Sequence, residues 1–226
     1  MVSIVVPTYN EVQNITVLLN QLTHILRRER YEIIVVDDNS PDGTGNAVMK
    51  KSKTSNNIRL LTRHNDRGLS SAIVSGFEHA KGDVFLVLDA DLSHDPRIIP
   101  RMIREIDNGA DMVVGSRRVA GGGVDNWPRY RKLTSDIATL LARLFLHIPI
   151  RDPMSGYFCL RRELYTSIKD RLDAKGYKIL LEIYAYARPH QVVEVPYIFK
   201  NRTQGYSKLS ETVISQYISM LRKLRY

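Results

Sequence analysis

Short apolar runs alternate with segments of helical periodicity over the first 116 residues, and this alternation restricts the fold more than any other feature. The runs predict buried strands, which cover residues 3–6, 33–36, 58–61, 84–88 and 112–114. The segments between them are amphipathic: from Val12 to Leu26, for example, apolar side chains recur at helical spacing. Apolar strands that alternate with amphipathic helices predict an α/β fold with a mostly parallel sheet flanked by helices.

The second half of the chain is less regular. It predicts an apolar helix over residues 133–146, a strand over 192–195 and a final helix over 209–225. We therefore expect one α/β domain over residues 1–208, followed by a basic amphipathic helix over 209–226. The only cysteine, Cys159, lies in an apolar stretch and cannot form an internal disulfide, so we expect it in the core.

Polar residues follow the predicted strands at their carboxyl ends. These polar segments cover residues 8–11, 37–38, 89–91 and 116–117. In a parallel sheet the carboxyl ends of the strands share one edge, and ligands bind beyond that edge. The sequence therefore predicts a site built from these segments.

Asp89 and Asp91 are two carboxylates just past a buried strand, so they can converge on one divalent cation. Oxygen ligands of this kind suit Mg²⁺ or Mn²⁺, which share their remaining positions with phosphate oxygens and water. The alternative is a solvated acidic turn. The preceding strand favours the metal site, because a solvated turn does not need two carboxylates there.

Asp38 can accept hydrogen bonds from a ribose or a base, as the acidic residue of dinucleotide folds does. The alternative is a helix cap, because residues 38–42 are rich in capping side chains. We expect both, with Asp38 facing the ligand and a neighbour capping. Neither a Gly-x-Gly-x-x-Gly segment nor a Gly-Lys-Ser/Thr loop follows any predicted strand, so Rossmann cofactor binding and P-loop hydrolysis lack sequence support.

The charge favours anionic partners. Lys and Arg number 33 against 24 Asp and Glu, which gives a net charge of +9. The N-terminus lacks the pattern of a signal peptide. The longest mostly apolar run, residues 137–150, is shorter than the roughly 20 residues that a membrane-spanning helix needs, so we expect no integral membrane segment within the chain as given.

Ten segments of the chain form two sets of motifs. The first set is Val-Pro-Thr-Tyr-Asn-Glu at 6–11, Val-Val-Asp-Asp-Asn-Ser-Pro-Asp-Gly-Thr at 35–44, Gly-Leu-Ser-Ser-Ala at 68–72 and Asp-Ala-Asp-Leu-Ser-His at 89–94. The second set is Gly-Ser-Arg at 115–117, Asn-Trp-Pro-x-Tyr-Arg-Lys at 126–132, Asp-Pro-Met-Ser-Gly-Tyr-Phe at 152–158, Gly-Tyr-Lys-Ile-Leu-Leu-Glu at 176–182, Val-Glu-Val-Pro at 193–196 and Arg-x-x-Gly-x-Ser-Lys-Leu at 202–209. The first set resembles family 2 glycosyltransferases of the GT-A fold, and the second resembles, more narrowly, dolichol-phosphate mannose synthases. The motifs follow the family order across nearly the whole chain.

This resemblance implies the transfer of mannose from GDP-mannose to dolichyl phosphate, with inversion at the anomeric carbon. It assigns the guanosine to Pro7, Tyr9, Glu11, Val36 and Asp38. It assigns the diphosphate and sugar to Asp89, Ala90, Asp91, Ala174, Arg202 and Lys208. It assigns a Mg²⁺ or Mn²⁺ ion to Asp89, Asp91 and Ser93. Family members have Gln at the third metal position, where this chain has Ser93, whose hydroxyl can ligate directly or through water.

The catalytic roles implied by the resemblance fall to Asp91, Arg117 and Arg131. Arg117, Arg131 and Ser135 are expected to hold the acceptor phosphate, since the guanidinium fork matches phosphate. A phosphate monoester has a second pKa near ~6, so it needs positioning rather than a general base. We therefore expect Asp152 to position its loop or a basic side chain, Arg151 or Arg131. His94 and His190 lack a zinc-type partner and are interpreted as structural or surface residues.

The lipid acceptor implies work at a membrane surface, on the cytoplasmic face of the endoplasmic reticulum or of an archaeal cell membrane. The helix over residues 133–146 and the basic tail after Lys208 can dock there, although each also fits an ordinary core or surface helix. The resemblance also raises a membrane anchor, as a partner subunit or as a transmembrane segment beyond Tyr226.

Three alternatives remain open from the sequence. The same fold can use UDP-glucose or another donor with the same kind of lipid phosphate. A nucleotidyltransferase also uses a metal and carboxylates, but it would carry a Gly-rich basic loop after the first strand, where residues 7–11 are Pro-Thr-Tyr-Asn-Glu. A basic nucleic-acid-binding module would not need the Asp89–Asp91 pair, so we expect no nucleic-acid partner.

Overall fold

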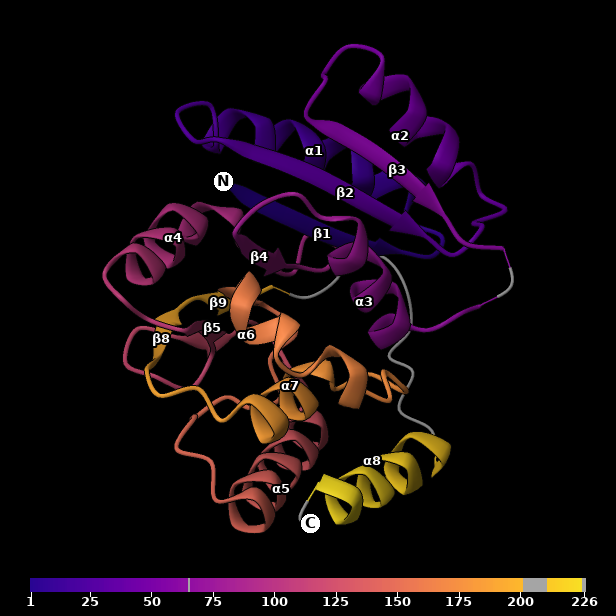
Figure 1. Cartoon of the computed structure of the whole chain (residues 1–226). Coiled ribbons are helices and arrows are strands. Elements are labelled where there is room, and N and C mark those ends of the chain that lie inside the picture. The colour runs from indigo at the N-terminus through magenta and orange to yellow at the C-terminus, as the bar shows by residue number, and fades with distance from the viewer. Residues whose placement is uncertain (65, 201–210, 225–226) are drawn as a thin grey trace.

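The computed structural model describes residues 1–64, 66–200 and 211–224, of which 211–216 are described as backbone only. Seven strands of this described part form one sheet in the order β3-β2-β1-β4-β7-β5-β8 (Figure 1). Their bounds are β1 (Val2–Thr8), β2 (Tyr31–Asp37), β3 (Ile58–Thr62), β4 (Val84–Val87), β5 (Met112–Ser116), β7 (Phe158–Arg161) and β8 (Val192–Pro196). Two shorter strands, β6 (Gly123–Val124) and β9 (Ile198–Phe199), pair separately.

Helices cover both faces of the sheet. They are α1 (Val12–Ile25), α2 (Thr44–Ser52), α3 (Leu69–His79), α4 (Ile99–Asp107), α5 (Arg129–Leu146), α6 (Arg162–Thr166), α7 (Ile179–Ala187) and α8 (Glu211–Leu224), with short 3-10 turns η1 (Pro96–Ile98) and η2 (Lys169–Arg171). Alternate side chains of each strand enter opposite cores, as strand geometry requires: Ile4 packs with α1 and α4, whereas Val5 packs with α3 and α7. The predicted helix-flanked α/β sheet is therefore confirmed.

β7 departs from the prediction. It runs antiparallel between β4 and β5, with Phe158 opposite both Val87 and Val114. Its first residue therefore lies beside the last residues of two parallel strands. As a result, the loop before β7 reaches the edge of the sheet where the sequence predicts a site. The sequence pattern at 158–161 indicates only an apolar stretch and predicts no strand there. It also predicts no helix at the positions of α2, α6 and α7.

α5 and α8 lie side by side at the far end of the molecule from β3 (Figure 1). They pack together with α7 through a third apolar cluster that includes Ala142, Leu181 and Leu221. α5 begins at Arg129, four residues before the predicted start, because three of the four residues in its first turn are basic and only Tyr130 interrupts them. No helix among the described residues has the length and apolar character to cross a bilayer.

The outer face of α5 is unusually apolar for a surface. Five large apolar side chains at successive helical spacings are each more than half exposed; they are Tyr130, Leu133, Ile137, Leu140 and Leu144. We call these five residues the α5 stripe. Soluble monomers rarely expose large contiguous apolar patches, so the stripe is unusual for a surface that faces only water.

Candidate active site

The ends of β1 and β2 carry the residues assigned to the guanosine. Asp37 is buried, and it accepts hydrogen bonds from the hydroxyls of Thr8 (2.8 Å) and Ser40 (2.6 Å). Asp42 accepts from the N–H groups of Val12 and Thr44, the first residues of α1 and α2. A neighbour of Asp38 therefore holds helix starts, as expected.

Asp38 is buried against an arginine that sequence reasoning missed. Arg63 donates from Nε and Nη2 to Asp38 Oδ1, at 2.8 and 2.5 Å, and the N–H of Gly68 donates to Oδ2 at 3.0 Å. Each side chain of the pair is only 9% exposed. Arg63 directly follows β3, so its place at the end of a predicted strand was a signal that could have drawn attention to it.

The other assigned guanosine residues differ in exposure. Tyr9 is 37% exposed, and the guanidinium of Arg67 lies 4.9 Å from the centre of its ring. The carboxylate of Glu11 accepts from the Asn14 side chain. Pro7 and Val36 are buried in the sheet, so their backbone is what a ligand at this edge would meet.

The carboxylate pair follows β4. Asp91 is buried, and both the hydroxyl and the N–H of Ser93 donate to its Oδ1, at 2.5 and 3.0 Å. Ala90 between the two carboxylates is buried, while the Asp89 side chain is 26% exposed and borders a cleft. The geometry thus places all three predicted metal ligands in one tight turn.

Two carboxylates and a hydroxyl form a hard, all-oxygen donor set, which fits Mg²⁺ or Mn²⁺ rather than zinc. Within the described residues, no group of three or more His, Cys, Asp or Glu side chains has the arrangement of a metal site. An ion held by Asp89, Asp91 and Ser93 would therefore depend on oxygens from a substrate or water for its other positions.

His94 is buried against the carboxylate pair. Its Nδ1 accepts a hydrogen bond from the N–H of Asp89 at 3.0 Å, and its ring stacks on Tyr157 with centroids 4.9 Å apart. This supports the structural interpretation of His94, whereas His190 is exposed before β8. Cys159 is fully buried in β7, as predicted for a core residue, and burial raises the pKa of its thiol.

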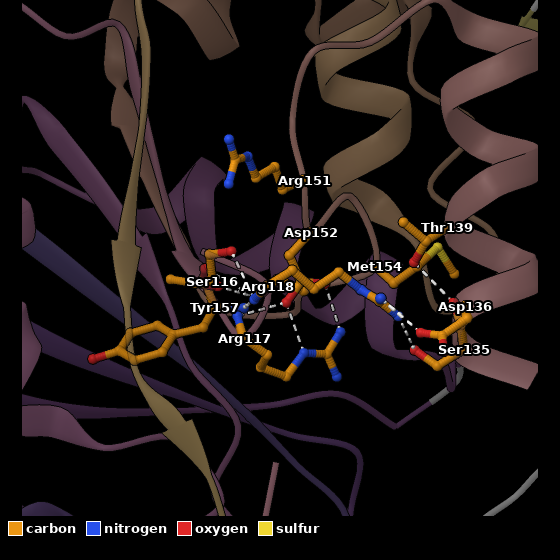
Figure 2. A network of polar contacts seen from close by, with 12 residues as sticks. Ser116, Arg117, Arg118, Ser135, Asp136, Thr139, Arg151, Asp152, Met154 and Tyr157 are labelled. Carbon is orange, nitrogen blue, oxygen red and sulfur yellow. Dashed lines mark hydrogen bonds and ion pairs between the residues drawn. The ribbon is translucent and has the colours of Figure 1, made fainter. Parts of the chain in front are cut away.

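Arg117 and Asp152 form the central ion pair of the β5–β7 edge (Figure 2). Arg117 donates from Nε and Nη2 to the two oxygens of Asp152, both at 2.7 Å, and its own N–H donates at 2.9 Å. The side chain of Asp152 is fully buried, and that of Arg117 is 9% exposed. Burial alone would raise the pKa of Asp152, but the hydrogen bonds and charge of Arg117 outweigh it and lower that pKa.

Asp152 therefore positions a basic side chain, but the expected partners are wrong. Figure 2 shows the Arg151 side chain pointing away from the network. The guanidinium of Arg131 instead lies over the ring of Trp127, 4.2 Å from its centre. The sequence could not reveal the true partner, because Arg117 and Asp152 are brought together only by the antiparallel insertion of β7.

Arg118 was missed by the sequence analysis. It donates from Nη2 to the hydroxyl of Ser135 at 3.1 Å, and its Nη1 pairs with Asp136 at 2.7 Å (Figure 2). Gly122 makes this turn possible, because a Cβ there would lie 2.5 Å from the Ser116 carbonyl oxygen. The loop after β5 thereby directs Arg118 toward α5, while Arg117 turns to Asp152.

A cleft of about 670 Å³ joins these groups. Its lining includes four of the predicted site residues, Asp89, Arg117, Arg131 and Ser135. It continues along an apolar wall between α5 and α8, lined by Ile137, Ala138, Leu141, Met154, Tyr217, Ile218, Met220 and Leu224. None of the described residues that line it comes from the β1–β2 edge.

The loop before α7 closes one side of this cleft. Ala174 has φ +52°, and its N–H donates to Glu182 Oε2 at 3.2 Å. Burial raises the pKa of Glu182. The same loop is tied to α8 by the ion pair of Asp173 with Lys223, at 2.9 Å. Arg202 and Lys208, the other two residues assigned to the donor, lie outside the described residues.

Comparison with known proteins agrees with this arrangement. The family model described as Glycosyl transferase family 2 matches residues 3–168. A dolichol-phosphate mannosyltransferase of Pyrococcus furiosus is 43% identical over 99% of this chain and 63% of its own length. The one from Saccharomyces cerevisiae is 38% identical over 98% of this chain and 86% of its own length, and an undecaprenyl-phosphate mannosyltransferase of Micrococcus luteus is 34% identical over 94% and 88%. This chain therefore spans less than two thirds of the Pyrococcus relative.

Solved structures support the fold. A glucosyl-3-phosphoglycerate synthase from Mycobacterium tuberculosis, solved with Mn²⁺, UDP and phosphoglyceric acid, superposes with a TM-score of 0.76 at 20% identity. The superposition covers 100% of this chain and 78% of that one. Taken together, the family match, the close relatives and the shared fold show that the chain is a glycosyltransferase of family 2 and belongs, within it, with the dolichol-phosphate mannosyltransferases.

Proposed function

We propose that this protein transfers mannose, with inversion, from GDP-mannose to the phosphate of dolichyl phosphate or a similar polyprenyl phosphate at a membrane surface. The observation that carries the proposal is the shape of the cleft. One end holds Asp89, Arg117 and Arg131, and the other is an apolar channel between α5 and α8. Such a cleft suits an acceptor with an anionic head and an aliphatic tail.

The donor is expected to bind across the β1, β2 and β4 ends. Tyr9, Glu11 and Asp38, with the backbone of Pro7 and Val36, would hold the nucleoside, and Ala174 would approach the sugar. Asp89, Asp91 and Ser93 would hold Mg²⁺ or Mn²⁺ against the diphosphate, with Arg202 and Lys208 as further cations. The bound ion would stabilise the charge that develops on the departing diphosphate.

The acceptor is expected to bind between Arg117, Arg131 and Ser135. The buried pairing with Asp152 supports a positioning role for this carboxylate, because an acid with two hydrogen bonds from a buried arginine is a poor proton acceptor. The attacking oxygen belongs to a phosphate that is largely dianionic at neutral pH, so no protein base is needed.

Membrane association would bring the channel to its lipid. The α5 stripe could enter the headgroup region, while basic side chains nearby, such as Arg129, Lys132 and Arg143, meet anionic lipids. The proposed location is the cytoplasmic face of the endoplasmic reticulum or of an archaeal cell membrane, since the relatives named above are dolichol-phosphate mannosyltransferases and dolichol phosphate is a membrane lipid. An anchor could come from a partner subunit or from a transmembrane segment beyond residue 226.

Product analysis tests this function most directly. Purified protein would be given dolichyl phosphate in lipid vesicles with each of a panel of labelled donors, including GDP-mannose and UDP-glucose, in Mg²⁺ or Mn²⁺. Of the donors in the panel, we expect only GDP-mannose to give a product, which is dolichyl phosphate mannose. A glucosyl product from UDP-glucose would support sugar transfer to the lipid phosphate but would contradict GDP-mannose as the donor.

Asp91→Ala is the variant that tests the proposed metal site. It removes a proposed metal ligand at the rim of the sheet, so transfer should be abolished while the folded state remains. Circular dichroism and thermal melting check the fold. Full activity of the folded variant in either metal would refute the metal site.

A further inference from the structure

Lys178 is a cation of the cleft to which neither the sequence motifs nor the mechanism above gives a role. It stands at the N-terminus of α7, immediately before Ile179, and its side chain lines the cleft with Asp89 and Arg117. Its Nζ donates to the backbone carbonyl oxygen of Met154 at 3.2 Å. Among the described residues, Met154 is the hydrogen-bond partner of this ammonium, and no described carboxylate forms an ion pair with it.

The other cations of this region have partners on the protein. Arg117 is held by Asp152, Arg118 by Asp136, and Lys175 and Lys223 by Asp173. Lys178 lies in the same cleft as Arg117; burial and the charge of Arg117 lower its pKa to about 8, against the opposing influence of Asp152 and Asp89. An ammonium that is partly buried in a cleft beside another cation is stabilised when an anion joins it. The site is thus preorganised for a negatively charged ligand.

The position of Lys178 favours the acceptor phosphate over the nucleoside, and the GDP measurement below tests the donor diphosphate, which is assigned to Asp89 of the same cleft. The nucleoside residues lie at the β1 and β2 ends, whereas Lys178 contacts Met154 in the loop before β7, on the other half of the sheet. Met154 belongs to the apolar cluster between α5 and α8, and its sulfur lies 3.7 Å from the hydroxyl of Tyr217. The ammonium therefore lies where the apolar channel meets the charged end of the cleft.

We propose that Lys178 is a third cation for the acceptor, and that its ammonium binds the phosphate monoester of the polyprenyl phosphate beside Arg117 and Arg131. This rests on the proposed function. A lysine presents a compact charge on a flexible stem, unlike the planar fork of arginine. It can therefore follow the phosphate as one oxygen moves toward the anomeric carbon.

The charges balance in this step. The dianionic monoester forms a bond from its oxygen to the anomeric carbon, and the bond from that carbon to the diphosphate oxygen breaks, with its electron pair leaving on the nucleoside diphosphate. The acceptor changes from a dianion to a monoanionic diester, and no proton is transferred. Its attraction to Lys178 falls as product forms, which favours release.

The test compares Lys178→Met, which keeps the aliphatic stem, with Lys178→Arg, which keeps the charge. The matched control is Lys169→Met, an exposed lysine of η2 outside the cleft. The measurements are the KM and kcat with farnesyl phosphate, the GDP dissociation constant, and calorimetric binding of farnesyl phosphate and of farnesol without donor. Thermal melting checks the fold of each variant.

We expect Lys178→Met to weaken farnesyl phosphate binding and raise its KM by roughly 10- to 100-fold, the usual effect of a lost charged hydrogen bond. Its GDP affinity and its farnesol affinity should stay near wild type, and Lys178→Arg should recover part of the loss. Unchanged farnesyl phosphate binding in a folded Lys178→Met would overturn this inference alone, as would a loss confined to GDP. Absence of farnesyl phosphate binding by the wild type would instead overturn the proposed acceptor.

Discussion

Two buried arginine–aspartate pairs, one in each half of the sheet, make a useful comparison. Both arginine side chains are 9% exposed, and both donate from Nε and Nη2 to their aspartate. Arg63, which is paired with Asp38, also donates hydrogen bonds from Nη1 to the side chains of Ser71 and Asp66, and from Nη2 to the carbonyl oxygen of Gly68. Arg117, beside Asp152, has no hydrogen bond from Nη1 to any described residue, and it borders the cleft.

The first pair closes on the protein and the second borders the cleft. Arg63 joins β2 to the loop before α3, so its donors stabilise the shape of the nucleoside edge. Arg117 is held by Asp152 with part of its fork left to face the cleft. Equal burial therefore does not mean equal surroundings: the two pairs differ in whether the remaining guanidinium donors are used by the protein, and we expect this to separate a structural pair from a binding one.

Asp152→Ala, which removes the carboxylate of the second pair, should have the largest effect. It leaves the buried charge of Arg117 without a partner, so we expect a loss of about 3–5 kcal/mol in the free energy of unfolding. We also expect an activity loss greater than about 10³-fold, because the arginine that faces the acceptor is no longer held. Chemical denaturation and initial rates measure the two effects.

Formate or azide should not restore the activity of this variant, since geometry rather than proton transfer is lost. The acidic limb of its rate profile should stay with the second ionisation of the acceptor phosphate. Clear rescue would make Asp152 a base. Because the folded-state pKa of Asp152 is depressed, its contribution to wild-type stability is present above its unfolded pKa of about 3.9 and is lost as the pH falls through the folded-state value.

Arg63→Met tests the other ion pair of the comparison, Arg63 with Asp38. It strands the buried Asp38 carboxylate, so the stability loss should again be about 3–5 kcal/mol. The folded fraction should nevertheless keep its KM for lipid phosphate, because the pair serves the nucleoside edge. Arg59→Met, whose partner is Glu32 and whose side chain is 38% exposed, is the control and should cost about 1 kcal/mol or less. A raised lipid-phosphate KM in Arg63→Met would contradict the division into two halves.

Arg131→Ala tests the acceptor half with a smaller expected effect. The guanidinium lies 4.2 Å from the centre of the Trp127 ring, and the substitution removes one cation from the lining of the cleft. We expect the KM for polyprenyl phosphate to rise roughly 10- to 100-fold, with little change in the affinity for GDP. Equal weakening of GDP in this variant and in Arg202→Ala would show that the two phosphate sites are misassigned.

Leu144→Glu, on the α5 stripe, should have the smallest effect. Its side chain is 60% exposed, so the fold should tolerate the change. Losing the burial of one leucine in the headgroup region, worth about 1.5–3 kcal/mol at most, should weaken vesicle binding about tenfold. Met49→Glu, on the exposed side of α2, is the control. Activity toward a short water-soluble acceptor should be unaffected in both, and equal vesicle binding by both would refute docking through the stripe.

The two halves also differ in how far the sequence predicts them. β1, β2 and β4 are continuous apolar runs followed at once by polar residues, so strands and candidate ligands could be assigned from local pattern. β7 has four residues and its direction depends on neighbours far away in the chain. Local periodicity carries no information on such an insertion, and the partner of Asp152 was therefore mispredicted.

Individual residues show the same limit. Asp89 and Asp91 could be singled out because two carboxylates after a buried strand are unusual. Arg118 and Lys178 look like ordinary surface cations in a chain with 33 Lys and Arg residues. Only tertiary structure shows that one reaches Ser135 and that the other reaches Met154.

The reversed strand β7 also dictates an order of assembly during synthesis. β5 pairs only with β7 and β8 within the described sheet, and both come later in the chain. While the ribosome makes residues 117–157, β5 therefore has no neighbour, and β4 has one open side. Residues 158–161 then join the two parts in a single step, which also brings Asp152 to Arg117. The acceptor half of the catalytic cleft thus cannot form on a nascent chain until the middle of its sheet has been translated.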